Sequence, residues 1–255
     1  MTLLGGKDHK KTAFSCDFEE AKGRTLCKAW KNKLTSTPEW FGPVGLGHAL
    51  DDRERRQVSD TNRTAGIDAL LQQALPRFAE NIAFRCGAVE ITYAELDRQA
   101  RSLASTLVEL GVSSGDRVAI AMTKGVEMPV AIHGIWMAGA AFVPLDPQAP
   151  PSRLAGVIED CGIKFVIGAQ RSAVLLAQIA DLSDVEILGA TVPGAICHDV
   201  AKGAAAGFEP RTNSPDDIAY VMFTSGSTGV PKGMVHTHGS GRAFALMWAD
   251  LYELR

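Results

Sequence analysis

The chain has 255 residues, of which 46 % are hydrophobic, and a formal net charge of −3 at pH 7. That length can bury a sizeable core, as one large domain with a short extension or as two small domains. The near balance of acidic and basic residues gives no global basic field, which argues against nucleic acid as a partner. No uncharged apolar run reaches ~18 residues and the N-terminus lacks the apolar core of a signal peptide, so we expect no membrane span and no secretion.

Residues 1–59 differ in composition from the rest of the chain. Residues 7–33 are rich in lysine, residues 38–50 are rich in glycine and proline, and residues 51–56 are a run of mixed charge. Such a run is typical of a solvated face. We therefore expect a poorly packed leader or linker over residues 1–59 and a folded domain over residues 60–255.

From Thr92 onward the apolar spacing predicts alternating helices and strands. Thr92 and Glu95 form a capping box, which predicts a helix from Tyr93 to Leu110 that ends at Gly111. The other predicted elements are strands over residues 117–122, 141–145, 164–167, 185–188 and 218–223, and helices over residues 128–137, 151–161 and 171–180. This alternation predicts an α/β fold, with a largely parallel sheet and helices on both faces.

A glycine- and hydroxyl-rich loop follows the predicted strand 218–223. It reads Thr224-Ser-Gly-Ser-Thr-Gly-Val-Pro-Lys-Gly233. Glycines let the backbone approach an anion, amides and hydroxyls donate hydrogen bonds, and the lysine adds a positive charge, so the pattern is typical of a polyphosphate cradle. The candidate ligand-binding residues are Thr224, Ser225, Gly226, Ser227, Thr228, Gly229, Lys232 and Gly233. A flexible linker is the alternative, but it would not set Pro231 and Lys232 at fixed offsets behind a buried strand.

Histidines, cysteines and one aspartate elsewhere favour plain structural roles. His133 lies on a predicted apolar helix and is expected to be a core or interface residue, and Asp146 suits a turn. His236 and His238 have no third ligand nearby in sequence, which argues against a metal site. Five cysteines are odd in number and scattered, so reduced thiols in a cytoplasmic protein are the simplest account: Cys16, Cys27, Cys86, Cys161 and Cys197.

The glycine-rich loop resembles the phosphate-binding signature of the adenylate-forming (AMP-binding) enzymes. This superfamily includes acyl-CoA synthetases, luciferases and the adenylation domains of nonribosomal peptide synthetases. Residues 91–96, Ile-Thr-Tyr-Ala-Glu-Leu, resemble the first core motif of adenylation domains. Residues 136–147, Trp-Met-Ala-Gly-Ala-Ala-Phe-Val-Pro-Leu-Asp-Pro, resemble the second. The three stretches occur in the family's order, and the resemblance covers roughly residues 60–255.

The resemblance implies a ligase that activates a carboxylate with ATP and Mg²⁺. The carboxylate attacks the α-phosphate to give an acyl-adenylate and pyrophosphate, and a thiol of CoA or of a phosphopantetheinyl carrier protein then takes the acyl group. The loop would hold the β- and γ-phosphates, and Thr224 or Thr228 would lie near the metal. The resemblance assigns no catalytic residue within this chain.

Family members continue beyond this loop with segments that hold adenine, ribose and the acyl group, and with a C-terminal domain that carries a catalytic lysine. We therefore expect an incomplete, N-terminal portion of the adenylate-forming fold, with little or no catalysis on its own and with self-association through an exposed core. Residues 143–147 and 151–154 favour amino-acid adenylation in nonribosomal peptide synthesis. An acyl-CoA synthetase fragment, or a non-catalytic interaction protein that completes a partner chain, stays open as an alternative.

Overall fold

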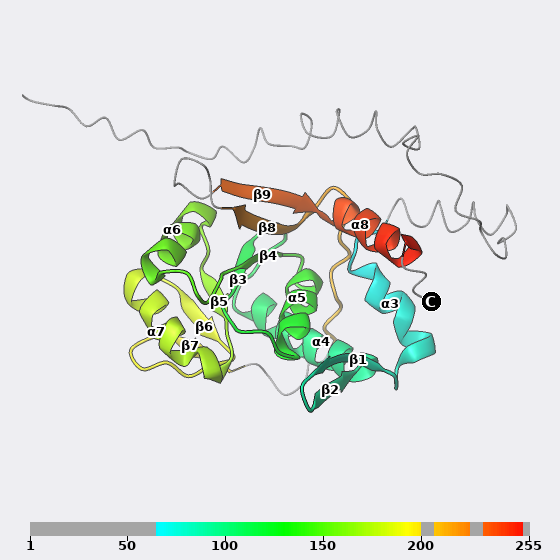
Figure 1. Cartoon of the computed structure of the whole chain (residues 1–255), viewed down its shortest axis with the longest axis horizontal. Helices are drawn as coiled ribbons and strands as arrows, with labels where there is room; N and C mark the ends of the chain where they lie inside the picture. Colours follow the sequence, from blue (N-terminus) through cyan, green and yellow to red (C-terminus); the bar gives the residue numbers. More distant parts are fainter. Residues whose placement is uncertain (1–64, 200–206, 225–231, 252–255) are drawn as a thin grey trace, which may run out of the picture. The chain divides into compact units, whose positions relative to one another are not determined.

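A seven-stranded sheet forms the centre of the fold. The computed structural model describes residues 65–199, 207–224 and 232–251 (Figure 1). The strands of this sheet are β3 (Arg117–Ile120), β4 (Ala141–Pro144), β5 (Phe165–Ile167), β6 (Glu186–Leu188), β7 (Cys197–His198), β8 (Ile218–Thr224) and β9 (Lys232–Thr237). Their spatial order is β7-β6-β5-β3-β4-β8-β9, and every pair is parallel except β8 with β9. The predicted α/β class with a largely parallel sheet is confirmed.

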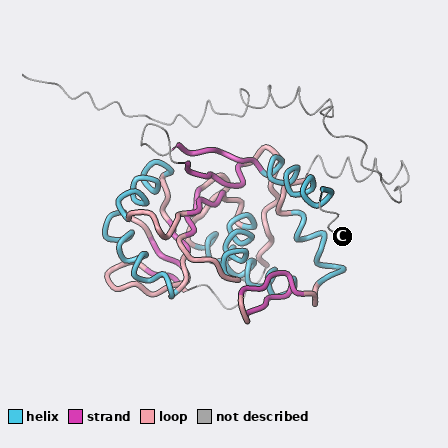
Figure 2. Tube along the Cα trace, viewed as in Figure 1, coloured by secondary structure: helices cyan, strands magenta, loops and turns pink. Residues whose placement is uncertain are grey.

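Helices cover both faces of this sheet, as predicted (Figure 2). The described helices are α3 (Ala69–Phe78), α4 (Tyr93–Glu109), α5 (Glu127–Met137), α6 (Pro151–Cys161), α7 (Ala173–Leu182) and α8 (His238–Leu251). Buried side chains of α4 and α5 form one hydrophobic cluster against the sheet, and those of α6 and α7 form a second cluster on the opposite face. A separate antiparallel hairpin consists of β1 (Ile82–Cys86) and β2 (Val89–Thr92).

The predicted caps set the ends of two of these helices. The backbone N–H of Glu95 donates to Oγ1 of Thr92 at 3.2 Å, so the N-terminal cap of α4 is confirmed. The next residue after the C-cap, Gly111, has a φ of 94°, a conformation that favours glycine. At the end of α6, Gly162 has a φ of 59° and its N–H bonds to the carbonyl of Glu159. These two glycines turn the chain out of the helices and into the following strands.

A glycine also controls how closely α4 and α5 approach each other. A Cβ atom added at Gly134 of α5 would lie 2.7 Å from Cδ2 of Leu103 on α4. Because side chains in a packed interior have little room to shift, only glycine allows this contact without rearrangement. The contact fixes the spacing of the two helices that cover one face of the sheet.

Helix length and polarity also bear on membrane insertion. Across residues 65–199, 207–224 and 232–251, every helix is too short or too polar to cross a bilayer.

Candidate phosphate-binding site

The candidate phosphate loop connects β8 to β9, so these two strands hold its ends. Thr224, the last residue of β8, pairs with Lys232, the first residue of β9. Directly opposed residues of an antiparallel pair have Cα atoms about 4.5–5.5 Å apart, so the ladder brings the hydroxyl residue and the lysine together. Both residues are exposed, as a site for a phosphate ligand requires.

The middle of the loop lies outside the described residues. This part of the chain, residues 225–231, contains five of the predicted binding residues: Ser225, Gly226, Ser227, Thr228 and Gly229. Their assignment to the phosphate ligand, and that of Thr228 to the metal, therefore stays a prediction from the sequence. The structure fixes the two points between which these residues must run.

Gly233 lies in β9, where it pairs with Phe223. A Cβ atom added at Gly233 would lie 3.2 Å from Cζ of Phe223 and 3.3 Å from Cγ1 of Val221. Such contacts are tighter than ordinary van der Waals distances, so a side chain at this position would displace the Phe223 ring. The sequence predicted Gly233 as a ligand-binding residue, and the structure gives it a packing role as well.

The loop lies at the carboxyl edge of the parallel part of the sheet. Strand β8 runs parallel to β4, with Phe142 paired with Tyr220. Connections at the carboxyl ends of parallel strands are where open α/β sheets place their ligands. Strand β8 therefore ends, at Thr224, where such sheets commonly carry a ligand-binding connection.

Aromatic rings support the hairpin from the face that carries α5. The ring of Tyr220 stacks on that of Phe142, with centroids 5.2 Å apart, and on that of His236, with centroids 4.5 Å apart. The indole Nε1 of Trp136 donates to the carbonyl of Ala219 in β8 at 2.9 Å. These contacts join β4, β8, β9 and α5, so the hairpin has a fixed position on the sheet.

A buried polar cluster holds the base of the hairpin, at the end opposite the loop. His238, the first residue of α8, is fully buried, and its Nδ1 lies 3.2 Å from Oδ1 of Asp68. The side-chain Nδ2 of Asn213 donates to Oδ2 of Asp68 and to the carbonyl of Trp136, both at 2.9 Å. Burial disfavours ionisation of Asp68, but its contacts with His238 and Asn213 outweigh burial and hold its pKa below the ordinary value.

Arg242 extends this cluster one turn further along α8. The residue is 2 % exposed, and its Nη1 donates to the carbonyl of Gly66 at 3.2 Å. Burial lowers the pKa of Arg242, while the charge of Asp68 opposes that change. Neither Asp68 nor Arg242 was predicted from the sequence to have a special role. The spacing of four residues between His238 and Arg242, which places both on one face of a helix, was the available signal.

The two other residues considered from the sequence, His133 and Asp146, make contacts typical of structural residues. His133 packs edge-on against Trp136 in α5, with ring centroids 5.3 Å apart. Asp146 accepts a hydrogen bond at Oδ1 from the backbone N–H of Gln148 at 2.9 Å, which confirms its predicted place in a turn. In the described segments, no three His, Cys, Asp or Glu side chains gather as they would around a metal ion.

Comparisons with known proteins agree with the motifs. A family model described as "AMP-binding enzyme" matches residues 71–254. The chain is 29 % identical over 232 residues to the N-(5-amino-5-carboxypentanoyl)-L-cysteinyl-D-valine synthase of Penicillium rubens, a match that covers 88 % of this chain and 6 % of that protein. It is 31 % identical over 211 residues to the dimodular nonribosomal peptide synthase of Bacillus subtilis, covering 80 % of this chain and 9 % of that one.

Among solved structures, the chain is similar to the O-succinylbenzoate coenzyme A synthetase of Bacillus subtilis, determined in complex with AMP. The TM-score is 0.58 and the identity is 26 %, over 70 % of this chain and 44 % of that chain. The chain therefore spans a small part of the two curated relatives, 6 % and 9 % of their lengths, and less than half of the solved enzyme.

Proposed function

We propose that the β8–β9 hairpin of this chain, which belongs to the family of AMP-binding enzymes, holds the phosphates of ATP during formation of an acyl-adenylate. The observation that carries this proposal is the pairing of Thr224 with Lys232 at the exposed ends of the loop. A hydroxyl and an ammonium group, side by side at the carboxyl edge of a parallel sheet, suit a polyphosphate ligand.

In this reaction an oxygen of the substrate carboxylate forms a bond to the α-phosphorus of ATP, and the bond from that phosphorus to the bridging oxygen breaks. Pyrophosphate leaves with the electron pair of the broken bond. Lys232 would offset the negative charge that builds up on the departing β- and γ-phosphates. The oxygen of Thr224 is a ligand type that Mg²⁺ prefers, and the bound ion would neutralise further phosphate charge.

Binding of tripolyphosphate with Mg²⁺ to the purified chain, measured by isothermal titration calorimetry, tests this assignment. Lys232→Ala and Thr224→Val should each weaken binding, and loss of the charge-assisted contact of Lys232 should amount to roughly 10- to 100-fold. Lys164→Ala is the matched control, because Lys164 is an exposed lysine next to the amino end of β5, at the opposite edge of the sheet. Unchanged binding by Lys232→Ala, or an equal loss in Lys164→Ala, would show that the hairpin is not the phosphate site.

We propose an amino acid as the carboxylate substrate of the whole protein. The motifs at residues 143–147 and 151–154 support this, as does the similarity to the Bacillus subtilis protein that is named as a nonribosomal peptide synthase. The alternative is an acyl-CoA synthetase, which the similarity to the Bacillus subtilis coenzyme A synthetase supports. Pyrophosphate–ATP exchange, measured on the whole protein with a panel of amino acids and of aryl and fatty acids, distinguishes an amino-acid substrate from the substrate of an acyl-CoA synthetase. Stimulation by aryl or fatty acids alone would exclude the amino-acid proposal.

A second candidate function is that of an interaction protein whose core is completed by a partner chain or by a second copy. Large apolar side chains on β9 and α8 support it, because five of them are 46–56 % exposed: Met234, Val235, Phe244, Met247 and Leu251. Neighbouring exposed apolar side chains of this kind are typical of surfaces that are covered in an assembly. Size-exclusion chromatography with light scattering tests the proposal on the freshly purified chain. A monodisperse monomer that binds no hydrophobic dye would count against it.

A further inference from the structure

The sheet has a topological switch point that the phosphate hairpin does not use. Strands β3 and β5 are neighbours, but β3 continues into α5 on one face and β5 continues into α7 on the other. In open α/β sheets, ligands bind in the crevice that forms outside the carboxyl ends of two such strands. Strand β4 lies between β3 and β8, so this crevice is separate from the loop that follows β8.

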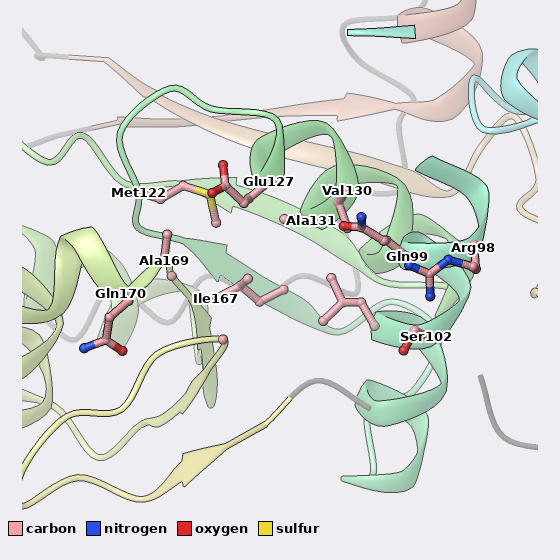
Figure 3. Close-up of a pocket in the computed structure, with 13 residues that line it drawn as sticks. Arg98, Gln99, Ser102, Met122, Glu127, Val130, Ala131, Ile167, Ala169 and Gln170 are labelled. Atoms are coloured by element: carbon pink, nitrogen blue, oxygen red, sulfur yellow. The ribbon is translucent and has the colours of Figure 1, made fainter. Parts of the chain in front are cut away.

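A cavity of about 600 Å³ opens at this switch point (Figure 3). Its volume lies within the range of small-molecule sites in proteins. The floor is apolar and consists of Met122 after β3, Ile167 and Ala169 at the end of β5, and Val130 and Ala131 of α5. Each of these five residues is at most 9 % exposed, so the floor is shielded from bulk water.

The spacing of α4 and α5 explains why space is left here. The two helices are in close contact at Gly134 and Leu103. One turn earlier in α5, Ala131 lines the cavity together with Gln99 and Leu103 of α4. The methyl group of Ala131 is too short to fill the space, and the equally short side chain of Ala169 leaves the opposite wall open.

The charged residues at the rim already have counter-ions within the chain. Arg98 is paired with Glu95, with Nη2 and Oε1 at 2.6 Å. Glu127 receives two hydrogen bonds from Arg171, at 2.6 and 3.0 Å. An ionic ligand would have to compete with these pairs for a counter-charge and would lose its own hydration on entering. The rim therefore favours a ligand without net charge.

We propose that this cavity is a binding site for an uncharged small molecule with an apolar body and a hydrogen-bonding group, separate from the phosphate site. The apolar body would lie on the floor of Met122, Ile167 and Ala131, and the polar group would face the rim. The volume suits a body of about one or two fused rings.

Indole is a suitable probe, because it is uncharged, apolar and carries one N–H donor. In methyl NMR of the chain labelled at methionine, indole should shift the resonance of Met122 saturably, with a dissociation constant on the order of 0.1–1 mM. Met222 in β8 and Met234 in β9 are partly exposed reporters outside the cavity and should not follow the same curve. A Met122 resonance that stays unmoved up to the solubility limit of indole would overturn the proposal.

Two substitutions fill the cavity from opposite walls, Ala131→Leu and Ala169→Leu. Each should weaken indole binding by roughly tenfold or more, because the added side chain occupies the ligand's space. Ala243→Leu, on an exposed position of α8, is the matched control and should bind as the unchanged chain does. Circular dichroism identifies which variants fold. If a folded cavity variant binds indole normally, the probe binds elsewhere and the assignment is wrong.

A charged analogue tests the ligand class independently of the location. Indole-3-acetate has the same ring system as indole and carries a carboxylate. It should bind in the cavity beside Met122 roughly tenfold more weakly than indole, because Arg98 and Glu127 at the rim are already engaged in ion pairs within the chain. Equal or tighter binding of indole-3-acetate would overturn the assignment of an uncharged ligand.

Discussion

Protonation of His133 should destabilise the folded chain as the pH is lowered. The ring lies in α5 against Trp136, and the residue is partly buried. Burial lowers its pKa from 6.5 to about 4, although the charges of Asp68 and Asp97 oppose the change. His133 is therefore neutral in the folded chain at a pH where it carries a proton in the unfolded chain.

The size of the effect follows from the two pKa values. Between pH 6.5 and about 4 the unfolded chain binds one more proton at His133 than the folded chain does. The free energy of unfolding therefore rises with pH between these two values and decreases by the same amount when the pH is lowered from about 6.5 to about 4. The difference between the two pKa values corresponds to about 3 kcal/mol when the window is crossed completely.

His133→Phe removes the titrating group and keeps a ring against Trp136. Urea unfolding of both proteins, from about pH 7 to about pH 4.5, measures the free energy of unfolding at each pH. Relative to the unchanged chain, the variant should gain about 2–3 kcal/mol over this range, because it escapes the uptake of that proton. Parallel curves for the two proteins would show that His133 is solvated or paired in the folded state, and the burial argument would be wrong.

The helix contacts and the hairpin give the remaining predictions. Gly134→Ala should lower the free energy of unfolding by about 1–3 kcal/mol, because the new methyl group meets Leu103 at 2.7 Å. Gly156→Ala, in α6 with open space around it, should instead raise the free energy of unfolding by up to ~1 kcal/mol. If urea unfolding shows that the two substitutions change this free energy in the same direction, the packing argument is wrong. Trp136→Phe should remove the indole N–H that donates to the carbonyl of Ala219. It should therefore lower the free energy of unfolding by about 1–3 kcal/mol and speed amide hydrogen exchange in β8. Unchanged exchange in β8 would refute the anchoring role of Trp136.

Helices with local end signals were predictable from the sequence. The predicted helix 93–110 is observed as Tyr93–Glu109, and the predicted helix 151–161 as Pro151–Cys161. Capping hydroxyls, prolines and glycines act over three or four residues, so their effect can be deduced without knowledge of the fold.

Strand β9 was not predicted, although it carries part of the candidate site. Four of its six residues are exposed, and its sequence lacks the alternation that marks a half-buried strand. It is a strand because β8 lies beside it, and a loop of seven residues lies between the two. The sequence therefore identified Thr224 and Lys232 by residue type, but not that the sheet places them opposite each other.

The cluster around His238 was beyond prediction for a different reason. His238 and Asp68 are far apart in the sequence, and their contact depends on where α8 and the segment before α3 meet α5. From the sequence, His238 could be considered only as a metal ligand together with His236, and its contact with Asp68 could not be predicted. A histidine that is 0 % exposed, beside a carboxylate and an indole ring, has the surroundings of a structural residue.

The position of this cluster bears on the proposed phosphate-binding role of the hairpin. Strand β9 passes directly into α8 at His238, so the cluster holds the hairpin at the end opposite the loop. At the loop end, Thr224 and Lys232 are exposed and project beyond the packed core. A phosphate group is strongly hydrated, so a site that takes it from water must remain open while its donors keep fixed positions. A hairpin that is packed at its base, with Thr224 and Lys232 exposed at its other end, would meet both requirements.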